Sequence, residues 1–326
     1  MTTYKEIKGT NIEVLESDPS NPVEGQVWYN STSNVLKGSV LTAAGAWATG
    51  GNLNTTRKGN SGGGTKDSAI TMGGNTGSVT TATEVYNGTS WTSVSGMGTA
   101  KYGGGGGGAS NTSAIAFGGD AAPLTVNTEI WSGSSWTEVA NLNAAREGLG
   151  GTGIATSALA IGGQPSTAAV ESWNGTSWTE VNDLNTARFP VGASGDTNTN
   201  ALAFGGNVSP RGQTESWNGS SWTEVSDLSV GRTAPGGAGA NNTSALAFGG
   251  NAPSVPGNTG STELWNGSSW STSTSMSTAR DFFGSDGFST AAWAAGGGVP
   301  SGPGLTNVTE EFTGAGAAVT RTFTDS

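Results

Sequence analysis

Residues 214–225 read Thr-Glu-Ser-Trp-Asn-Gly-Ser-Ser-Trp-Thr-Glu-Val, and the apolar stretch Ala-Leu-Ala-Phe-Gly-Gly precedes them at 201–206. Variants of this phrase recur along the chain, and Gly-Gly doublets mark six units that lie 43 to 47 residues apart. A fixed period in this range indicates a repeat architecture, in which each unit buries its apolar face against its neighbours. The doublets begin at Gly73, Gly118, Gly162, Gly205, Gly249 and Gly296.

Each unit contains four short segments with the character of β-strands. In the second unit they are the glycine-rich stretch 105–109, the apolar stretch 113–119, and the alternating stretches 128–131 and 135–139. Asn-Gly joins the third and fourth segments in four units, and this dipeptide favours the type I′ turn of a β-hairpin. Four antiparallel strands in a unit of this length are typical of a propeller blade.

We therefore predict an all-β fold, a six-bladed β-propeller of four-stranded antiparallel blades over residues 41–314. The last unit lacks the Ser-Trp-Thr strand, whereas an unmatched strand surrounds Trp47 near the start of the chain. We expect this strand to complete the blade formed by residues 281–314, which would close the ring and leave only short edges. A helical solenoid is excluded because glycine and β-branched residues fill every window without a 3.6-residue period.

The repeat resembles the kelch family in its Gly-Gly doublet, an aromatic residue several positions later, a Trp, and a cation after the Trp strand. The resemblance covers residues 45–314 and implies a propeller. It departs from the family in an unusually glycine-rich first strand. Kelch propellers that oxidise sugars use a copper centre with His and Tyr ligands, and this chain has no histidine. WD40 propellers are a poorer match, since their Gly-His and Trp-Asp signatures are absent.

Residues 1–40 lie outside the repeat. A loop at 18–22 is followed by Gly-Gln-Val-Trp-Tyr-Asn at 25–30 and a Leu-Lys strand near 35–38, which together predict a small hairpin. This order resembles a small module common in bacteriophage virion and tail-fibre proteins, and the resemblance implies an anchoring segment. The alternative is a hairpin that packs on the propeller wall. We assign residues 315–326 to a C-terminal tail.

Composition excludes several classes of function. The formal charge is −11 and the bases are scattered, so no basic stripe for nucleic acid is present. No apolar run is long enough for a membrane span, and the N-terminus lacks the apolar region of a secretory signal. With no His and no Cys, the commonest general base, metal ligand and thiol nucleophile are missing. We expect no cofactor and no metal, and Asp281 with Asp286 forms only a weak carboxylate pairing.

Charged residues occur in register with the repeat. One Glu falls in the third strand of each unit and one cation follows the fourth strand. We expect structural ion pairs within or between blades, because a binding site on a propeller is usually asymmetric, and we expect the tryptophans to form the core. The charged positions are Glu84, Glu129, Glu171, Glu215, Glu263 and Glu310, with Arg57, Lys101, Arg146, Arg188, Arg232 and Arg280.

The loops between the second and third strands differ most from unit to unit. Pro, Ser and Asn are prominent in these loops, and Arg211 is their only cation. The loops are residues 75–82, 120–127, 164–169, 207–213, 251–261 and 298–308. Loops held on a rigid scaffold are where binding normally resides. We therefore expect the propeller face that carries these loops to contact a protein neighbour or a glycan. The candidate binding residues are Arg211, Asn251, Pro253, Pro256, Asn258, Pro300 and Pro303.

These observations favour a non-enzymatic structural or attachment protein of a phage tail, fibre or capsid surface. Residues 1–40 would contact other virion proteins, the loop face would bind a protein or host surface polysaccharide, and the chain would form a homo-oligomer. Released by lysis, a virion protein needs no signal peptide. The alternatives are an extracellular or cell-surface adhesin of a bacterium and, less compatible with the sequence, a glycan-acting enzyme, which would need convergent carboxylates at the central mouth.

Overall fold

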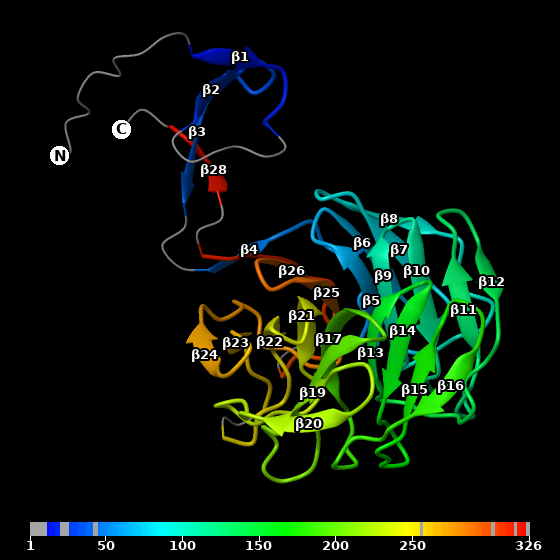
Figure 1. Cartoon of the computed structure of the whole chain (residues 1–326). Helices are drawn as coiled ribbons and strands as arrows, with labels where there is room; N and C mark the ends of the chain where they lie inside the picture. The colour runs from blue at the N-terminus through cyan, green and yellow to red at the C-terminus, as the bar shows by residue number, and fades with distance from the viewer. Residues whose placement is uncertain are drawn as a thin grey trace. The chain divides into compact units, whose positions relative to one another are not determined.

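The computed structural model describes residues 12–19, 26–41, 45–254, 257–300, 304–315 and 318–323. The described residues form β-strands, turns and loops, and within them no helix is long and apolar enough to cross a membrane. The chain divides into two compact units, Ala46–Phe312 and a smaller unit made of Met1–Gly45 and Thr313–Ser326. The expectation of an all-β fold built from four-stranded antiparallel sheets is confirmed (Figure 1).

The larger unit contains six four-stranded sheets. Blades one to three are β5 (Ser61–Thr65), β6 (Ser68–Met72), β7 (Thr83–Tyr86) and β8 (Trp91–Val94); β9 (Gly105–Ser110), β10 (Ser113–Phe117), β11 (Thr128–Trp131) and β12 (Trp136–Glu138); and β13 (Gly150–Ile154), β14 (Ser157–Ile161), β15 (Val170–Trp173) and β16 (Trp178–Val181). Blades four to six are β17 (Gly192–Thr197), β18 (Asn200–Phe204), β19 (Thr214–Trp217) and β20 (Trp222–Val225); β21 (Gly236–Asn241), β22 (Ser244–Phe248), β23 (Thr262–Trp265) and β24 (Trp270–Ser273); and β25 (Gly284–Phe288), β26 (Ala291–Ala295), β27 (Thr309–Thr313) and β4 (Ala46–Thr49).

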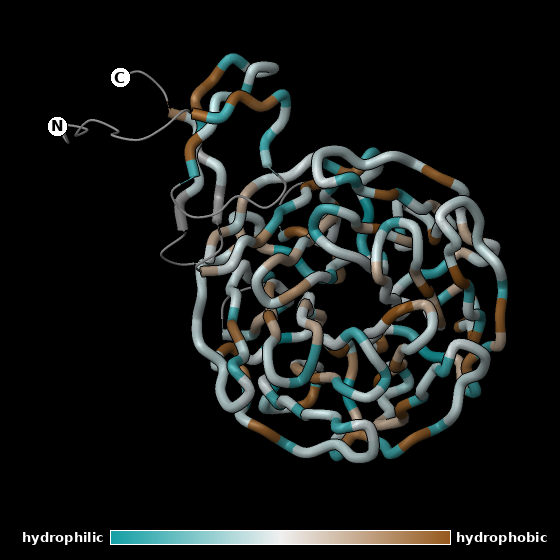
Figure 2. The backbone as a smooth tube through the Cα atoms, turned by 45° about the horizontal axis from the view of Figure 1, so that its top comes forward, coloured by the Kyte–Doolittle hydropathy of each residue, from teal (hydrophilic) through white to brown (hydrophobic). Residues whose placement is uncertain are grey.

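The first strand of each blade lines a central axis (Figure 2). Each of these inner strands contacts the next one along the chain, and β25 contacts β5, so the six form a ring. Strand β4, which surrounds Trp47, lies beside β27 as the outer strand of the last blade, as the sequence predicted. Glycine suits the inner strands because their backbones approach closely; a Cβ on Gly237 would lie 2.0 Å from the carbonyl oxygen of Ala193.

The Asn-Gly turns differ from the expected type I′ geometry. In the fourth blade the last strand pair is Trp217 with Trp222, so the connection has four residues. Gly219 has a φ of +92°, but Asn218 is not in the left-handed region. Instead, the Oδ1 atom of Asn218 accepts the backbone N–H groups of Ser220 and Ser221, each at 2.9 Å. The Asn therefore stabilises the turn through its side chain, as in an Asx turn.

Tryptophans fill the space between blades, which confirms their assignment to the core. In the fourth blade the rings of Trp217 and Trp222 lie 5.2 Å apart, and both side chains are buried. The outer Trp of five blades donates its indole N–H to a Thr hydroxyl at the start of the third strand of the preceding blade. These pairs are Trp47–Thr262, Trp91–Thr309, Trp136–Thr83, Trp178–Thr128 and Trp270–Thr214.

The register charges form buried ion pairs, so the structural interpretation is confirmed. The Arg232 guanidinium donates to the Glu263 carboxylate, to the carbonyl oxygen of Ser261 at 2.7 Å and to that of Gly249 at 3.2 Å. Glu263 also accepts the backbone N–H of Ser229 at 2.7 Å, so each pair ties a blade to the segment leading into it. The pairs are Arg57–Glu84, Lys101–Glu129, Arg146–Glu171, Arg188–Glu215, Arg232–Glu263 and Arg280–Glu310.

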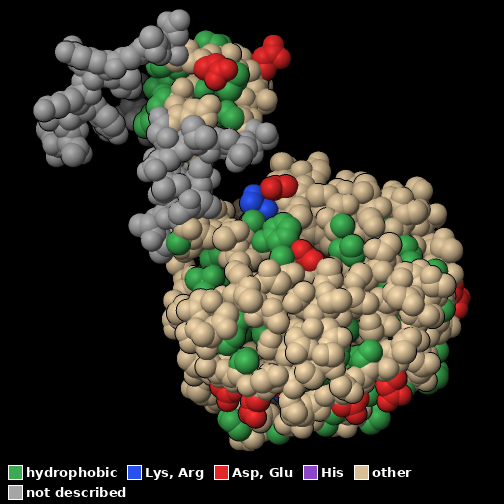
Figure 3. Space-filling view, viewed as in Figure 1, with side chains coloured by type: hydrophobic (Ala, Val, Ile, Leu, Met, Phe, Trp, Pro, Cys, Tyr) green, Lys and Arg blue, Asp and Glu red, His purple; other side chains and the backbone are tan. Residues whose placement is uncertain are grey.

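Few charged side chains occupy the face of the larger unit shown in Figure 3, which consists mainly of backbone and uncharged polar groups. This agrees with a composition in which only 11% of residues are charged.

The smaller unit is a sheet of β1 (Glu13–Leu15), β2 (Val27–Asn30), β3 (Val35–Leu41) and β28 (Ala318–Thr322), in that order. The expected hairpin is present as β2 and β3. Residues 318–322, which we placed in a C-terminal tail, instead pair with β3. The sequence did not indicate this pairing because the two strands come from opposite ends of the chain.

Asp18 organises the N-terminal motif. Its carboxylate accepts hydrogen bonds from the Trp28 indole at 3.1 Å, from Asn30 at 2.8 Å and from Lys37 at 2.7 Å. Burial opposes ionisation of Asp18, but these three donors outweigh it and lower the pKa of the carboxyl group. The spacing of Asp, Trp, Asn and Lys in the motif therefore has a structural cause.

Candidate binding site at the channel mouth

One position on the rim of the central channel differs in every blade. It directly follows the buried cation, and its backbone pairs with the residue after the Gly-Gly doublet, as Tyr102 does with Asp120 and Asp281 does with Gly298. The scaffold thus repeats while the side chain changes among basic, acidic, aromatic and polar types. The six residues are Lys58, Tyr102, Glu147, Phe189, Thr233 and Asp281.

Backbone hydrogen bonds connect neighbouring blades at the residue that follows each variable rim position. Gly103 donates its N–H to the carbonyl oxygen of Gly59 at 2.8 Å, and Gly148 donates to that of Gly103 at 2.7 Å. Gly59 donates in turn to Phe282, and Ala234 to Pro190. The rim is therefore a fixed frame of backbone that holds the variable side chains in place.

Phe282 is held in an unusual conformation on this frame. Its φ is +49°, in the left-handed region where the corresponding residue Gly59 has a φ of +67°. A bulky residue seldom occupies this region, and such strain clusters at functional sites. The Phe282 ring stacks on Tyr102 with centroids 6.1 Å apart and planes 27° apart. A Cβ on Gly59 would lie 2.2 Å from the Tyr102 ring, so glycine leaves the space that this pair needs.

A hollow of about 150 Å³ lies beside the stacked pair. Aromatic faces and Pro190 line it together with the polar groups of Glu147 and Gln164. Apolar rings with a few oriented polar groups are the usual composition of a small-molecule site. The lining residues are Tyr102, Gly103, Glu147, Gly148, Gln164, Phe189, Pro190 and Phe282.

Two carboxyl groups with perturbed acidity flank Tyr102. Burial and the charge of Asp120 raise the pKa of Glu147. Burial also raises the pKa of Asp281, although Asn258 and Lys58 partly oppose the shift. Burial raises the pKa of Tyr102, and the charges of Glu147 and Asp281 add to that effect. The mouth thus combines stacking surfaces with carboxyl groups that retain a proton more readily than usual, as general acids do.

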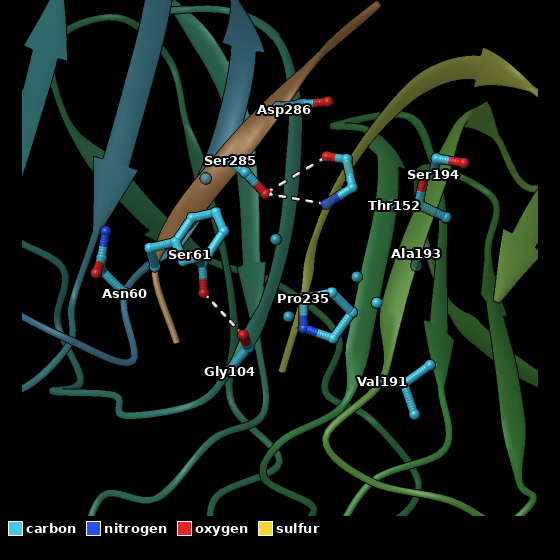
Figure 4. A pocket seen from close by; sticks show the side chains of 17 residues that line it. Asn60, Ser61, Gly104, Thr152, Val191, Ala193, Ser194, Pro235, Ser285 and Asp286 are labelled. Carbon is cyan, nitrogen blue, oxygen red and sulfur yellow. Dashed lines mark hydrogen bonds between the residues drawn. The ribbon is translucent and has the colours of Figure 1, made fainter. Parts of the chain in front are cut away.

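Next to the mouth the channel contains a polar cavity of about 110 Å³ (Figure 4). Its walls are the inner strands, from which Ser61 donates to the carbonyl oxygen of Gly104 at 2.9 Å. Asn60 and Ser194 are buried there, and the Oδ1 atom of the first and the hydroxyl of the second have no hydrogen-bond partner among the described residues. Asp286 belongs to the same wall.

The predicted loop residues that the structure describes lie outside the aromatic hollow beside Tyr102. Asn251 donates to Asn258 at 3.1 Å, and Asn258 donates to the carbonyl oxygen of Gly298 at 2.8 Å. These contacts and the bond to Asp281 give Asn258 a supporting position. Pro253 and Pro300 are exposed.

Arg211 lies on another loop, where its carbonyl oxygen accepts the N–H of Arg232 at 2.9 Å. Pro256 and Pro303 lie outside the described residues. None of the five predicted residues that the structure describes lines the aromatic hollow.

The sequence analysis did not predict the rim residues, because it selected candidates from the variable loops between the second and third strands. The signal was present in the sequence: the residue after each register cation changes from Lys58 to Tyr102, Glu147, Phe189, Thr233 and Asp281, although a cation precedes it in every unit. A divergent position beside a repeated one points to a role that the scaffold does not require.

The fold resembles that of YjhT, a solved structure. The match has a TM-score of 0.66 and 12% sequence identity, and it covers 83% of this chain and 99% of YjhT. At this identity the likeness shows the fold alone, and it supports the propeller assignment. No family model matches the chain, and no curated protein matches its sequence.

The expectation of a non-enzymatic protein is corrected by these findings. It rested on missing His and Cys and on the absence of convergent carboxyl groups. The structure shares a propeller fold with YjhT, and it brings Glu147 and Asp281 close enough to Tyr102 for both charges to raise the pKa of its hydroxyl. The proximity of Glu147 and Asp281 to Tyr102 was not visible in the sequence, since these two acids are 134 positions apart.

Proposed function

We propose that the channel mouth binds a saccharide. The observation that carries this proposal is the stacked pair of Tyr102 and Phe282, with Phe282 held at a φ of +49° beside a hollow of about 150 Å³. Sugar rings present apolar C–H faces that pack on aromatic rings and hydroxyl groups that donate to carboxylates. Glu147 and Gln164 supply the polar partners in the same hollow.

An array of neutral and charged oligosaccharides, followed by titration calorimetry on the full chain, tests this proposal. Tyr102→Ala and Phe282→Ala should each weaken binding by about tenfold or more, since loss of an aromatic contact costs on the order of 1–2 kcal/mol. Phe288→Ala is a matched control, because Phe288 is an exposed aromatic at the far end of the strand that follows Phe282. Equal affinity of all three variants and the wild type would contradict the proposal.

A second candidate function is hydrolysis of a glycosidic bond at the same mouth. The specific support is the raised pKa of Glu147 and of Asp281 on either side of Tyr102. One carboxyl group would protonate the leaving oxygen while the other, ionised, would act as base or nucleophile. Glu147→Gln and Asp281→Asn should abolish release of reducing ends while retaining saccharide binding; release at the wild-type rate would exclude hydrolysis by this pair.

The setting we propose for this activity is the surface of a phage particle, with the N-terminal unit as the anchor to other virion proteins. Its support is the resemblance of residues 18–38 to virion modules. Mass spectrometry and immunogold labelling of purified particles test it. Stoichiometric protein on the particle would support this setting, whereas protein found only on cells or in the medium would favour the bacterial adhesin.

A further inference from the structure

The aromatic hollow beside Tyr102 contains a carboxyl group without a counter-charge. Glu147 lines this hollow, and the lining includes neither Lys nor Arg. Within the part of the chain that the structure describes, no cation forms an ion pair with Glu147, and its carboxylate accepts no hydrogen bond. The adjacent cation, Arg146, does not compensate it, because the Arg146 guanidinium donates to Glu171 at 2.8 Å. Glu147 therefore brings an uncompensated carboxyl group to the hollow.

A second carboxyl group lies near Glu147. Asp120 follows β10, its backbone pairs with that of Tyr102, and its Oδ1 atom accepts the backbone N–H of Ala122 at 2.6 Å. Burial raises the pKa of Glu147, and the charge of Asp120 raises it further, so the two carboxyl groups interact. Two neighbouring carboxylates repel each other, and a cation beside Glu147 would be attracted by both.

Asp281, the other acid of the rim, is compensated in part. Asn258 donates a hydrogen bond to its carboxylate, and the charge of Lys58 also favours ionisation, although burial outweighs both and raises the pKa of Asp281. Asp281 does not line the aromatic hollow. The mouth therefore keeps a partly neutralised acid away from the hollow, whereas Glu147, which has no such support, lies in its lining.

The composition of the hollow selects the charge of its ligand. Tyr102 and Phe189 supply aromatic rings, which attract a cation as well as the apolar face of a sugar. An ammonium group would form a charge-assisted hydrogen bond with Glu147. A carboxylated sugar would instead be repelled by Glu147 and Asp120, since like charges at short range are unfavourable. The surroundings of Glu147 thus favour a ligand that combines a sugar ring with a positive charge.

We propose that the saccharide bound at the channel mouth carries a free amino group, which pairs with Glu147 while the sugar ring packs on the aromatic side chains. This inference rests on the saccharide site proposed above and names its substrate class. An N-acetylated sugar would lose the ion pair, and an acidic sugar would bring a further negative charge. Because the amine must be protonated and Glu147 ionised, affinity for the amino sugar should be greatest between the pKa values of these two groups.

Titration calorimetry on the full chain with matched trisaccharides tests the inference. The pairs are glucosamine with N-acetylglucosamine and galactosamine with N-acetylgalactosamine, and galacturonic acid is the acidic member. In one pair the amino form should bind about tenfold more tightly than the acetylated form, as expected for a hydrogen bond between charged groups, and the acidic form should bind most weakly. Glu147→Gln should remove the advantage of the amino form. Glu180→Gln is the matched control and should keep it, since Glu180 is exposed on the outer strand β16.

The control is needed because a net charge of −11 attracts any cationic oligosaccharide. Equal losses in Glu147→Gln and Glu180→Gln would overturn the inference, because the general field of the protein would then explain the preference. Equal affinity for the amino and acetylated members of both pairs would also overturn it, and would leave the saccharide site standing. If none of the saccharides in the wider array binds, the saccharide site falls and this inference falls with it.

The pH dependence gives a second readout. Affinity of the wild type for the amino form should fall as the pH is lowered through the range in which Glu147 takes up a proton, and affinity for the acetylated form should fall less. Glu147→Gln should remove this difference between the two forms. A fall of the same size for both forms in the wild type would contradict an ion pair between the amine and Glu147.

Discussion

At the scale of single residues, one indole N–H is without a partner. Five outer tryptophans donate to a Thr of the preceding blade, but the sixth, Trp222, faces Val170 at the corresponding position. Its Nε1 atom is buried and has no acceptor among the described residues. The energetic cost of an unsatisfied buried donor is about 1–3 kcal/mol, so this site is a local defect in the repeat.

Replacing Val170 with Thr should repair that defect. The two side chains have nearly the same shape, and the hydroxyl would accept the Trp222 N–H as the Thr128 hydroxyl accepts that of Trp178 at 3.0 Å. We expect the free energy of unfolding in urea to rise by about 1 kcal/mol. Thr128→Val is the reverse control and should lower it by a similar amount. A decrease for Val170→Thr would show that the lost apolar contact outweighs the hydrogen bond.

The residue scale also shows what sequence patterns can and cannot predict. Register alone predicted that the repeated cations and Glu residues form structural ion pairs, because both recur at fixed offsets. The structure shows which Glu each cation contacts, as Arg232 contacts Glu263. Asp286 was visible in the sequence, but its raised pKa was not predictable, since that shift depends on how deeply the carboxyl group is buried in the channel. The left-handed backbone of Phe282 was not predictable either, because it is set by the rim and not by the propensity of the residue.

At the scale of elements, each blade is tied to the incoming connection by a buried ion pair. Glu263 accepts from both Arg232 and the backbone of Ser229, and both charged side chains are at most 1% exposed. Glu263→Gln should lower the free energy of unfolding by about 3–5 kcal/mol, because it leaves a buried guanidinium without its counter-charge. Urea denaturation of the variant measures the effect.

A double-mutant cycle separates the pair from its surroundings. Arg232→Met combined with Glu263→Gln removes the uncompensated charge, so the double variant should be less destabilised than the sum of the two single variants. Strict additivity would mean that the two groups act through separate contacts, Arg232 through the carbonyl oxygens and Glu263 through the backbone N–H of Ser229.

Strand positions were predictable because hydrophobic alternation and the repeat both specify them. The turn type was not, since Asn-Gly serves both a two-residue turn and the longer connection stabilised by the Asn218 side chain. Pairing between β3 and β28 was also beyond the sequence, because each strand is short and long-range partners leave no local signal. The candidate site shared this difficulty: Tyr102 and Phe282 meet only when the ring has formed.

At the scale of the whole molecule, several carboxyl groups have pKa values above their ordinary range. Asp286 is the strongest case, and burial is the first cause for every member of the group. A raised folded-state pKa means that the folded protein binds more protons than the unfolded chain between the two pKa values. Their contribution to stability is therefore greatest at low pH and decreases as the pH rises. The members are Glu147, Asp196, Asp281, Asp286 and Glu311.

We therefore expect the Tm to decrease as the pH is raised from about 4 towards neutrality. Asp286→Asn should flatten this dependence, while Asp227→Asn, at an exposed position, should leave it unchanged. Asp18 acts in the opposite sense, since its lowered pKa favours the folded state at higher pH, but it belongs to the smaller unit. A Tm that rises steadily over this range would contradict the assignment of the raised pKa values.

Completion of the last blade by β4 has a consequence for synthesis on the ribosome. Trp47 is made early, but its partner strand begins at Thr309, about 260 residues further along. At roughly 5–20 residues per second, β4 waits about 13–50 s before β27 exists. During that interval Trp47 lacks Phe312, and for most of it also lacks Phe248, the two rings on which it packs in the finished ring. On a crowded polysome, β4 of one nascent chain can pair with β27 of a neighbouring chain. Slow elongation or high expression should therefore increase the fraction of strand-exchanged chains. Dilution during folding should decrease that fraction.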